Sequence, residues 1–354
     1  MSNDHTTTAP LLRVQDLRTY FPVRSGRFGT TRRVVKSVDG VSFELHRGKT
    51  LGLVGESGCG KTTLARTVLR LTAATSGTVT FDGQDVFAMA PRDVRRLRRH
   101  MQIVFQDPVG SLNPRLRVGT IVGEAPVVHG LVHSAAEADR LVADLLTRVG
   151  LSPDDRYRYP HEFSGGQRQR IGIARALALQ PSLIVCDEPI SALDVSIQAQ
   201  ILNLLADLQH DLGLTYLFIA HDLAVVRHVS DNVAVMYLGK IVEQAPTSQL
   251  FSDPRHPYTR ALLASAPDFV PLGDAGTPRM LAGEPPSPID PPPGCAFHPR
   301  CPIAVGECGR STPVLETPAG LPADHRVACF RADERTEARE SPAPTRQTSN
   351  ADGS

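Results

Sequence analysis

A glycine-rich loop between an apolar run and a helical pattern constrains this sequence more than any other feature. Residues 50–54 read as a buried parallel strand, and the apolar residues of 62–71 recur at helical spacing. Together they predict an α/β fold, a P-loop NTPase that binds a nucleoside triphosphate. The expected binding residues of this loop are Gly55, Glu56, Ser57, Gly58, Cys59, Gly60, Lys61, Thr62 and Thr63.

Each residue type in this loop has a chemical role toward a phosphate. Glycines permit backbone conformations that a β-carbon would block, so that successive N–H groups can point inward at the helix N-terminus. We expect Lys61 to reach the β- and γ-phosphates and the Thr62 hydroxyl to bind Mg²⁺. The alternative is a purely structural turn, which the flanking strand and helix patterns disfavour.

Two carboxylates end a second apolar run, residues 183–186. A carboxylate at the C-terminal end of a parallel strand faces the crevice where α/β folds bind ligands. We expect Asp187 to hold Mg²⁺, directly or through water, and Glu188 to orient and deprotonate the attacking water. The alternative is an acidic pair that only caps the next helix. The phosphate loop upstream favours the catalytic role.

A third motif resembles the signature of the ATP-binding-cassette (ABC) ATPases. A serine and glycines at a helix N-terminus suit a γ-phosphate, because the helix dipole is positive there. The resemblance implies that this segment serves the phosphate loop of a facing subunit, so that two ATP molecules are enclosed at a dimer interface. The resemblance to this family covers roughly residues 11–332. The signature residues are Ser164, Gly165, Gly166 and Gln167.

Further positions match the same family one by one. Gln106 resembles the Q-loop glutamine that contacts Mg²⁺ and senses the γ-phosphate, and Asp194 lies in a segment that resembles the D-loop at the dimer interface. His221 resembles the switch histidine, which contacts the γ-phosphate and makes a catalytic contribution beside Glu188 and Lys61. Either Phe21 or Tyr20 could stack on adenine, and either ring could equally belong to the core.

Composition narrows the remaining classes. The formal net charge of +1 gives no electrostatic footprint for nucleic acid. No run of 18 apolar residues is present, so transport would require separate membrane subunits. The sequence starts with polar residues and has only six cysteines, so we expect the protein to reside in the reducing cytosol. With the resemblance, this places the chain peripherally at the cytoplasmic face of the cell (inner) membrane.

The composition changes along the chain and divides it. We expect a disordered N-terminus at 1–10, an ABC nucleotide-binding domain at 11–253 with a helical subdomain at about 90–170, and a disordered, Ser- and Pro-rich tail at 333–354. Residues 254–332 form an irregular extension, because prolines are dense at 285–293. This extension resembles that of the ATPase subunits of oligopeptide and dipeptide importers, the "F" type in particular.

Four of the six cysteines lie in this extension, separated by five, six and twenty residues: Cys295, Cys301, Cys308 and Cys329. Four clustered thiols in a cytosolic, loop-rich segment favour a metal site over disulfides. Four thiolates can hold an iron–sulfur cluster or a structural Zn²⁺, and His298 could replace one ligand. The resemblance implies a [4Fe–4S] cluster; zinc, free thiols and disulfides remain open.

The resemblance implies an ATP-hydrolysing subunit that powers import of di- or oligopeptides. Its expected partners are a homologous ATPase in a heterodimer, two membrane permease subunits and, through them, an extracytoplasmic peptide-binding protein, with no nucleic acid. One alternative is import of nickel or another small solute by the same architecture. Another is a non-transport ABC ATPase, although the long coiled coils and DNA-contacting insertions of such proteins do not appear in this sequence.

Overall fold

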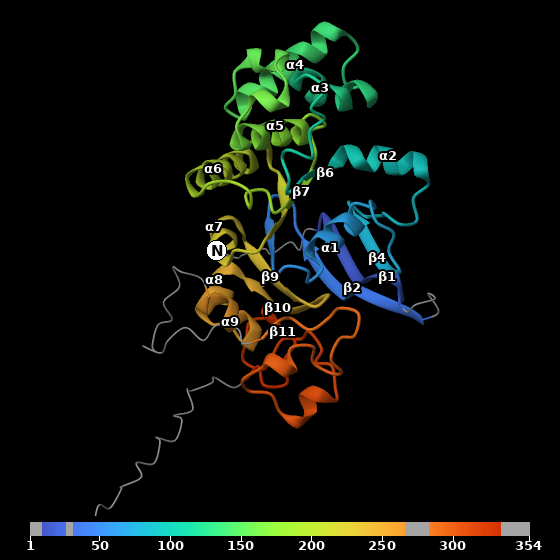
Figure 1. The fold of residues 1–354 in the computed structure, drawn as a ribbon, viewed down its shortest axis with the longest axis vertical. Helices are drawn as coiled ribbons and strands as arrows, with labels where there is room; N and C mark the ends of the chain where they lie inside the picture. Colours follow the sequence, from blue (N-terminus) through green and yellow to red (C-terminus); the bar gives the residue numbers. More distant parts are fainter. Residues whose placement is uncertain (1–8, 26–30, 266–282, 334–354) are drawn as a thin grey trace, which may run out of the picture.

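The computed structural model describes residues 9–25, 31–265 and 283–333 (Figure 1). Most of the two segments expected to be disordered, 1–10 and 333–354, lies outside these residues. Strands and helices alternate in the described part, as the sequence predicts for an α/β fold. None of the described helices combines the length and apolar character needed to cross a membrane.

The centre of the molecule is a seven-stranded sheet with the order β11-β10-β9-β3-β8-β7-β6. The strands β6, β7, β8, β3 and β9 are parallel, whereas β10 and β11 are antiparallel additions at one edge. The bounds are β3 Thr50–Val54, β6 Met101–Val104, β7 Leu183–Asp187, β8 Thr215–Ala220, β9 Asn232–Tyr237, β10 Lys240–Pro246 and β11 Arg326–Val327.

This sheet separates two hydrophobic cores, and β7 shows how. Leu183 and Val185 pack into one core, while Ile184 and Cys186 pack into the other. Successive side chains of a strand point to opposite faces, so a strand buried on both sides must be apolar throughout. The apolar runs that the sequence predicts as buried strands, β3 and β7, have no exposed residue.

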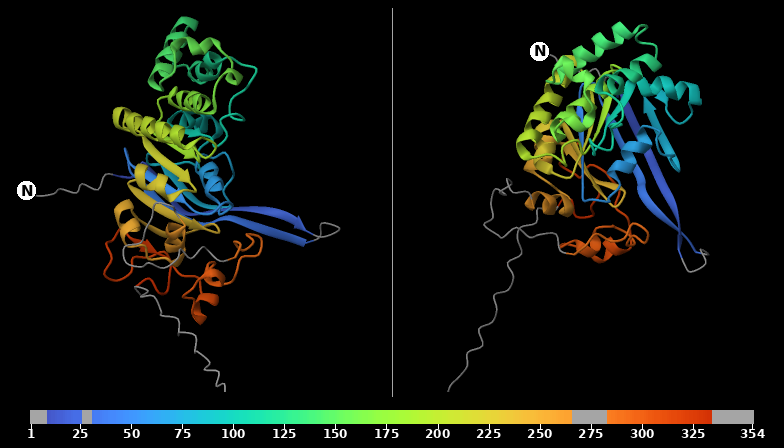
Figure 2. Two further views of the ribbon diagram at one scale, coloured as in Figure 1. Left: turned by 60° about the vertical axis from the view of Figure 1, so that its left-hand side comes forward. Right: turned by 45° about the horizontal axis from the view of Figure 1, so that its top comes forward.

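A second, antiparallel sheet with the order β2-β1-β4-β5 covers one face. Helix α1 contacts both sheets and lies in the core between them. Strands β1 and β2 form a long hairpin that projects from the body of the molecule (Figure 2). The bounds are β1 Leu12–Ser25, β2 Thr31–Leu45, β4 Ser76–Phe81, β5 Gln84–Asp85 and α1 Lys61–Val68.

Helices dominate the segment that joins β6 to β7 and form one end of the molecule (Figure 1). Strand β6 interrupts the range 90–170 expected for a helical subdomain, because it pairs with β7 in the main sheet. Helix α4 begins where the Ser134 hydroxyl accepts a hydrogen bond from Glu137 N, which is an N-cap. The bounds are α2 Pro91–His100, α3 Val118–Val128, α4 Ala135–Arg148, η1 Pro153–Tyr157, η2 Pro160–Glu162, α5 Gly165–Leu177, α6 Val195–Leu212 and α7 Leu223–Val229.

The C-terminal extension packs against the β9–β10 edge of the main sheet. It is mostly irregular, as its prolines predict, and contributes α9 Pro257–Ala264, η3 His298–Arg300, η4 Gly306–Gly309 and β11; helix α8 Thr247–Ser252 directly precedes it. The fully buried carboxylate of Glu243 on β10 binds the extension to the main sheet. It accepts hydrogen bonds from the N–H groups of Arg255 and His256 and contacts His325 Nε2 at 2.8 Å.

Candidate active site

The phosphate loop connects β3 to α1 and is held by close backbone contacts. A Cβ at Gly55 would lie 2.1 Å from the Met236 carbonyl oxygen, and one at Gly60 would lie 2.0 Å from that of Ser37. Both glycines have a positive φ as well, so no other residue fits there without strain. A Cβ at Gly58 would meet no atom within 4 Å. The loop is therefore held at Gly55 and Gly60 and is open at Gly58, where we expect the phosphates to bind.

Lys61 lies inside this loop with its side chain 4% exposed. Its ammonium group donates hydrogen bonds to the carbonyl oxygens of Gly55, at 2.7 Å, and Glu56, at 3.1 Å. Burial of a lysine requires such partners, since an isolated buried charge is costly. The contacts keep the cation at the loop, where we expect it to meet the β- and γ-phosphates.

The candidate magnesium ligands are in direct contact. The Thr62 hydroxyl donates a 3.0 Å hydrogen bond to Asp187 Oδ1, so the start of α1 meets the end of β7. Burial raises the pKa of Asp187, and the nearby Glu188 adds to the effect. A divalent cation would offset both. Mg²⁺ is usually bound by one or two carboxylates together with substrate phosphates, and this pair of oxygen donors fits that requirement.

Three predicted site residues converge on the carboxylate of Glu188. Gln106 Nε2 donates a 2.9 Å hydrogen bond to Oε2, His221 Nδ1 lies 3.6 Å from Oε2, and Lys61 Nζ lies 3.8 Å from Oε1. Residue 188 also has a φ of 48°. A non-glycine residue in this left-handed region is strained, and such strain concentrates at active sites. The backbone is therefore bent where the carboxylate enters the site.

The signature segment begins helix α5 and is shaped by a capping box. Ser164 Oγ accepts from Gln167 N at 3.3 Å, and Gln167 Oε1 accepts from Ser164 N at 3.0 Å. Ser164 and Gly165 are exposed, while a Cβ at Gly166 would lie 2.5 Å from Ile197 of α6. Asp194, the N-cap residue of α6, is exposed too. Signature and D-loop residues thus share one accessible surface.

The two candidates for adenine stacking differ in their surroundings. The Tyr20 hydroxyl donates to Asp39, and the Lys36 ammonium lies 5.8 Å from the centre of the Tyr20 ring. Burial and the bond to Asp39 raise the pKa of Tyr20 to about 12, so the hydroxyl keeps its proton. The Phe21 ring is 40% exposed. Phe21 is the ring left accessible, and its role in stacking remains a prediction.

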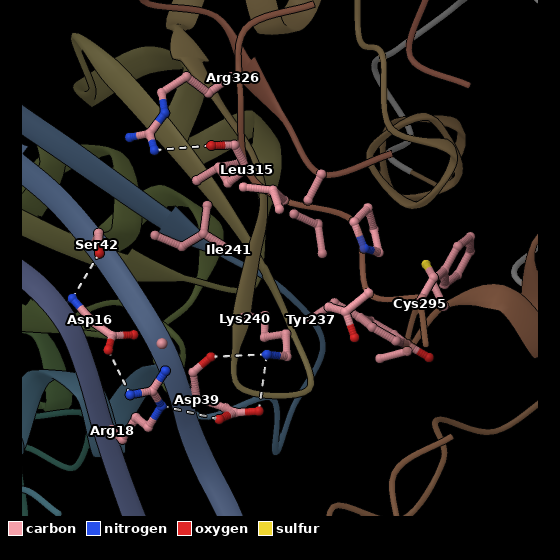
Figure 3. A pocket seen from close by; sticks show the side chains of 18 residues that line it. Asp16, Arg18, Asp39, Ser42, Tyr237, Lys240, Ile241, Cys295, Leu315 and Arg326 are labelled. Atoms are coloured by element: carbon pink, nitrogen blue, oxygen red, sulfur yellow. Dashed lines mark hydrogen bonds and ion pairs between the residues drawn. The ribbon is translucent and has the colours of Figure 1, made fainter. Parts of the chain in front are cut away.

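A pocket of about 300 Å³ lies between the β1–β2 hairpin, the β9–β10 turn and the extension (Figure 3). Asp39 forms ion pairs there with Lys240 at 3.0 Å and with Arg18 at 3.8 Å. The Asp39 N–H donates to the Gly239 carbonyl, and the Gly239 N–H donates to the Cys59 carbonyl. The charged wall of this pocket is therefore linked through one backbone turn to the phosphate loop.

The extension contributes two contacts to the phosphate loop that the sequence does not reveal. The guanidinium of Arg300 binds the carboxylate of Glu56 through two hydrogen bonds, at 2.8 and 3.0 Å. The Glu56 N–H donates to the Tyr258 hydroxyl at 2.8 Å. Arg300 and Glu56 are 244 positions apart, and no motif or spacing links them.

The four cysteines of the extension are all unpaired and line one small cavity. Burial raises the pKa of Cys301 to about 11 and raises that of Cys295 and Cys329. His298 uses Nδ1 to bond the Cys295 carbonyl at 2.9 Å. Among the described residues, no three histidine, cysteine or acidic side chains lie close enough to hold a single metal ion. The four thiols therefore share one cavity, and the described residues lend no support to a bound metal or cluster.

Fold and site together define an ATPase of the ATP-binding-cassette class. Residues 38–191 match the family model described as "ABC transporter". Residues 242–308 match a second model, described as "Oligopeptide/dipeptide transporter, C-terminal region". Among solved structures, cbiO1 from Clostridium perfringens, part of the ABC transporter complex cbiONQ, has a TM-score of 0.59 and 27% identity, covering 70% of this chain and 92% of its own.

Curated relatives resemble almost the whole chain. The oligopeptide transport ATP-binding protein AppF from Bacillus subtilis is 52% identical over 321 residues, 90% of this chain and 96% of AppF. The dipeptide transport ATP-binding protein DppF from Escherichia coli is 47% identical over 333 residues, 94% of this chain and 98% of DppF. The chain belongs to this family of ABC transporter ATP-binding proteins, and the resemblance found in its motifs is confirmed.

Proposed function

We propose that this chain hydrolyses ATP to power the import of di- or oligopeptides through an ABC transporter. The convergence of Lys61, Gln106 and His221 on Glu188 carries the ATPase part of the proposal. The cargo is inferred from the extension, whose family model is described by oligopeptide and dipeptide transport, and from the names of the two relatives.

Each group at the ATP site has a role in this proposal. The N–H groups of the phosphate loop and the Lys61 ammonium bind the phosphates, and Thr62, Asp187 and Gln106 would hold Mg²⁺, which neutralises charge on the β- and γ-phosphates when bound. Glu188 accepts the proton of the attacking water. His221, whose Nδ1 lies 3.6 Å from that carboxylate, would contact the γ-phosphate.

The signature residues act on the ATP of a facing subunit in this proposal. The exposed positions of Ser164, Gly165 and Asp194 support it, since a surface that binds another subunit's nucleotide must be accessible. We propose a homologous ATPase as the partner, in a heterodimer. Closure of the pair on two ATP molecules would drive the permeases outward-facing, and hydrolysis would reset them.

A groove between α3 and α4 is the proposed contact with the two permease subunits. It has a volume of about 560 Å³ and a mainly apolar lining. Val127 and Val128 on its rim are 55% and 52% exposed, which is unusual for side chains of this type. A short amphipathic helix from a permease fits such a groove. This contact would hold the chain at the cytoplasmic face of the inner membrane, and the permeases would connect it to a peptide-binding protein outside.

We propose further that the four cysteines hold a [4Fe–4S] cluster. The four thiols line one small cavity, and thiolates are ligands both of iron–sulfur clusters and of structural zinc. The resemblance to the importer subunits favours the cluster over zinc. Anaerobically purified protein should absorb broadly in the visible range and contain iron. A colourless preparation that contains zinc would reject this assignment.

Transport itself tests the main proposal. A strain that lacks the chain should lose uptake of a labelled dipeptide or oligopeptide and regain it from a plasmid copy, but not from a Glu188→Gln copy. Competition between unlabelled peptides and Ni²⁺ identifies the cargo. If the strain that lacks the chain loses uptake of Ni²⁺ but keeps uptake of peptides, nickel import replaces peptide import as the proposed function. If its uptake of every solute equals that of the parent strain, the chain does not serve a transporter.

A further inference from the structure

The strongest contact between the extension and the ATP site is the ion pair of Arg300 with Glu56. Its two hydrogen bonds are parallel, one from each terminal nitrogen to one carboxylate oxygen. The Arg300 side chain is 5% exposed and that of Glu56 is 22% exposed. Bidentate pairs shielded from water are both stronger and more directional than surface pairs. The pair raises the pKa of Arg300 further above its ordinary range, so the guanidinium keeps its charge.

A cluster of aromatic rings holds the same region together. Tyr258 of α9 is fully buried, and its ring centre lies 4.7 Å from that of Tyr237 at the end of β9. Phe297, three positions before Arg300, packs against both rings at 5.3 and 5.4 Å. The extension thereby anchors itself on the cassette core. It presents one hydroxyl and one guanidinium to the second residue of the phosphate loop.

These two groups act on different parts of Glu56. The Tyr258 hydroxyl accepts from the Glu56 N–H at 2.8 Å and fixes the peptide between Gly55 and Glu56. Arg300 neutralises the side-chain carboxylate. That charge matters because Glu56 belongs to a loop built to receive a polyanion, and an unpaired carboxylate in such a site repels phosphates.

We propose that Arg300 and Tyr258 are positioning residues of the ATP site. They keep the phosphate loop in its binding conformation and cancel the charge of Glu56, so the C-terminal extension is part of the nucleotide-binding apparatus. Because Arg300 directly precedes Cys301, the loop that carries the cysteines also carries this support. The proposal rests on the ATP-binding function proposed above and adds a specific requirement for the extension.

A double-mutant cycle tests the charge argument on the full-length chain. The dissociation constant of a fluorescent ATP analogue is measured for wild type, Arg300→Ala, Glu56→Ala and the double variant. We expect Arg300→Ala to weaken binding about tenfold, because it leaves an uncompensated carboxylate. Glu56→Ala should weaken binding less than Arg300→Ala does, and the double variant should bind about as well as Glu56→Ala, because the carboxylate that Arg300 compensates is then absent. Arg310→Ala, at an exposed arginine of the same extension, is the matched control.

Two further measurements separate positioning from stability. Tyr258→Phe keeps the ring and removes the acceptor of the Glu56 N–H, so KM for ATP should rise several-fold while kcat changes little. Arg300→Lys keeps the charge, loses the bidentate geometry and should lie between wild type and Arg300→Ala. Thermal unfolding of each variant shows whether the chain is folded.

The outcomes that overturn the proposal are distinct from failure of the ATPase function. Wild-type affinity in folded Arg300→Ala, or equal losses in Arg300→Ala and the double variant, would show that the pair does not serve the nucleotide. Absence of ATP binding by the wild-type chain would instead reject the proposed function. If Arg300→Ala fails to fold, Arg300→Lys decides, because it keeps the charge and loses only the bidentate geometry; wild-type affinity in folded Arg300→Lys would then show that this geometry does not serve the nucleotide.

Discussion

Gln106 Nε2 donates a hydrogen bond of 2.9 Å to Glu188 Oε2, across 82 positions of sequence. The loop after β6 and the loop after β7 are thereby joined at the carboxylate proposed as the base. Since the amide donates through its nitrogen, its oxygen is the atom that would bind Mg²⁺. In the proposed mechanism one side chain would thus contact both the cation and the base, with the γ-phosphate between them.

Replacement of Glu188 by glutamine should abolish most hydrolysis. The isosteric amide keeps a partner for Gln106 but cannot accept the proton of water, so we expect kcat of the assembled transporter to fall by about 10²- to 10⁴-fold. ATP affinity should be retained. Phosphate release and nucleotide binding are measured side by side, with Glu137→Gln on α4 as control. Unchanged turnover in Glu188→Gln would mean that another group is the base.

If the signature acts on the partner's nucleotide, a substitution in it should affect the assembled transporter and not ATP binding by the isolated chain. Ser164→Arg should leave ATP binding by the isolated chain unchanged and lower hydrolysis by the assembled transporter at least tenfold. Ser134→Arg is a matched control, since it removes the equivalent N-cap of α4 at a similar cost in stability. Loss of ATP binding by the isolated Ser164→Arg chain would place the signature at its own phosphate loop.

The neighbouring rings of β1 form a natural pair for testing adenine recognition. Phe21→Ala should weaken ATP binding by the loss of one base-stacking contact, about 1–3 kcal/mol by comparison with other protein–base stacks. Tyr20→Phe removes only the hydroxyl that bonds Asp39 and should bind ATP as wild type does. Equilibrium binding of ATP and of triphosphate alone measures the effect. A loss confined to Tyr20→Phe would reverse the assignment.

The apolar groove of the helical end predicts where the permeases dock. Charging its rim with Val127→Asp and Val128→Asp should weaken assembly with the permeases and abolish transport, while ATP binding by the isolated chain stays intact. Val314→Asp, at an equally apolar side chain of the extension that is 71% exposed, is the control. Co-purification with the permeases is the readout. Full assembly of the double variant would exclude this groove as the docking site.

The sequence predicts the local elements of this site well and its long-range supports poorly. The phosphate loop and Asp187–Glu188 each follow a short apolar run, and the signature begins a helix, so these elements and the two strand ends can be inferred. That Lys61, Gln106 and His221 meet at Glu188 follows from the family resemblance. The pair of Arg300 with Glu56 follows from neither, because it depends on how an irregular segment packs. For the same reason, spacing alone did not show that the four cysteines line one cavity.

The strand order has a consequence for synthesis of this chain. Strand β3, which leads into the phosphate loop, pairs with β8 and β9, and these begin only at Thr215 and Asn232. While the ribosome makes the first two hundred residues, β3 has both hydrogen-bonding edges unpaired, and such apolar edges promote aggregation. The Arg300 contact arrives later still. The nucleotide site therefore matures among the last parts of the molecule, although its most recognisable motif emerges first.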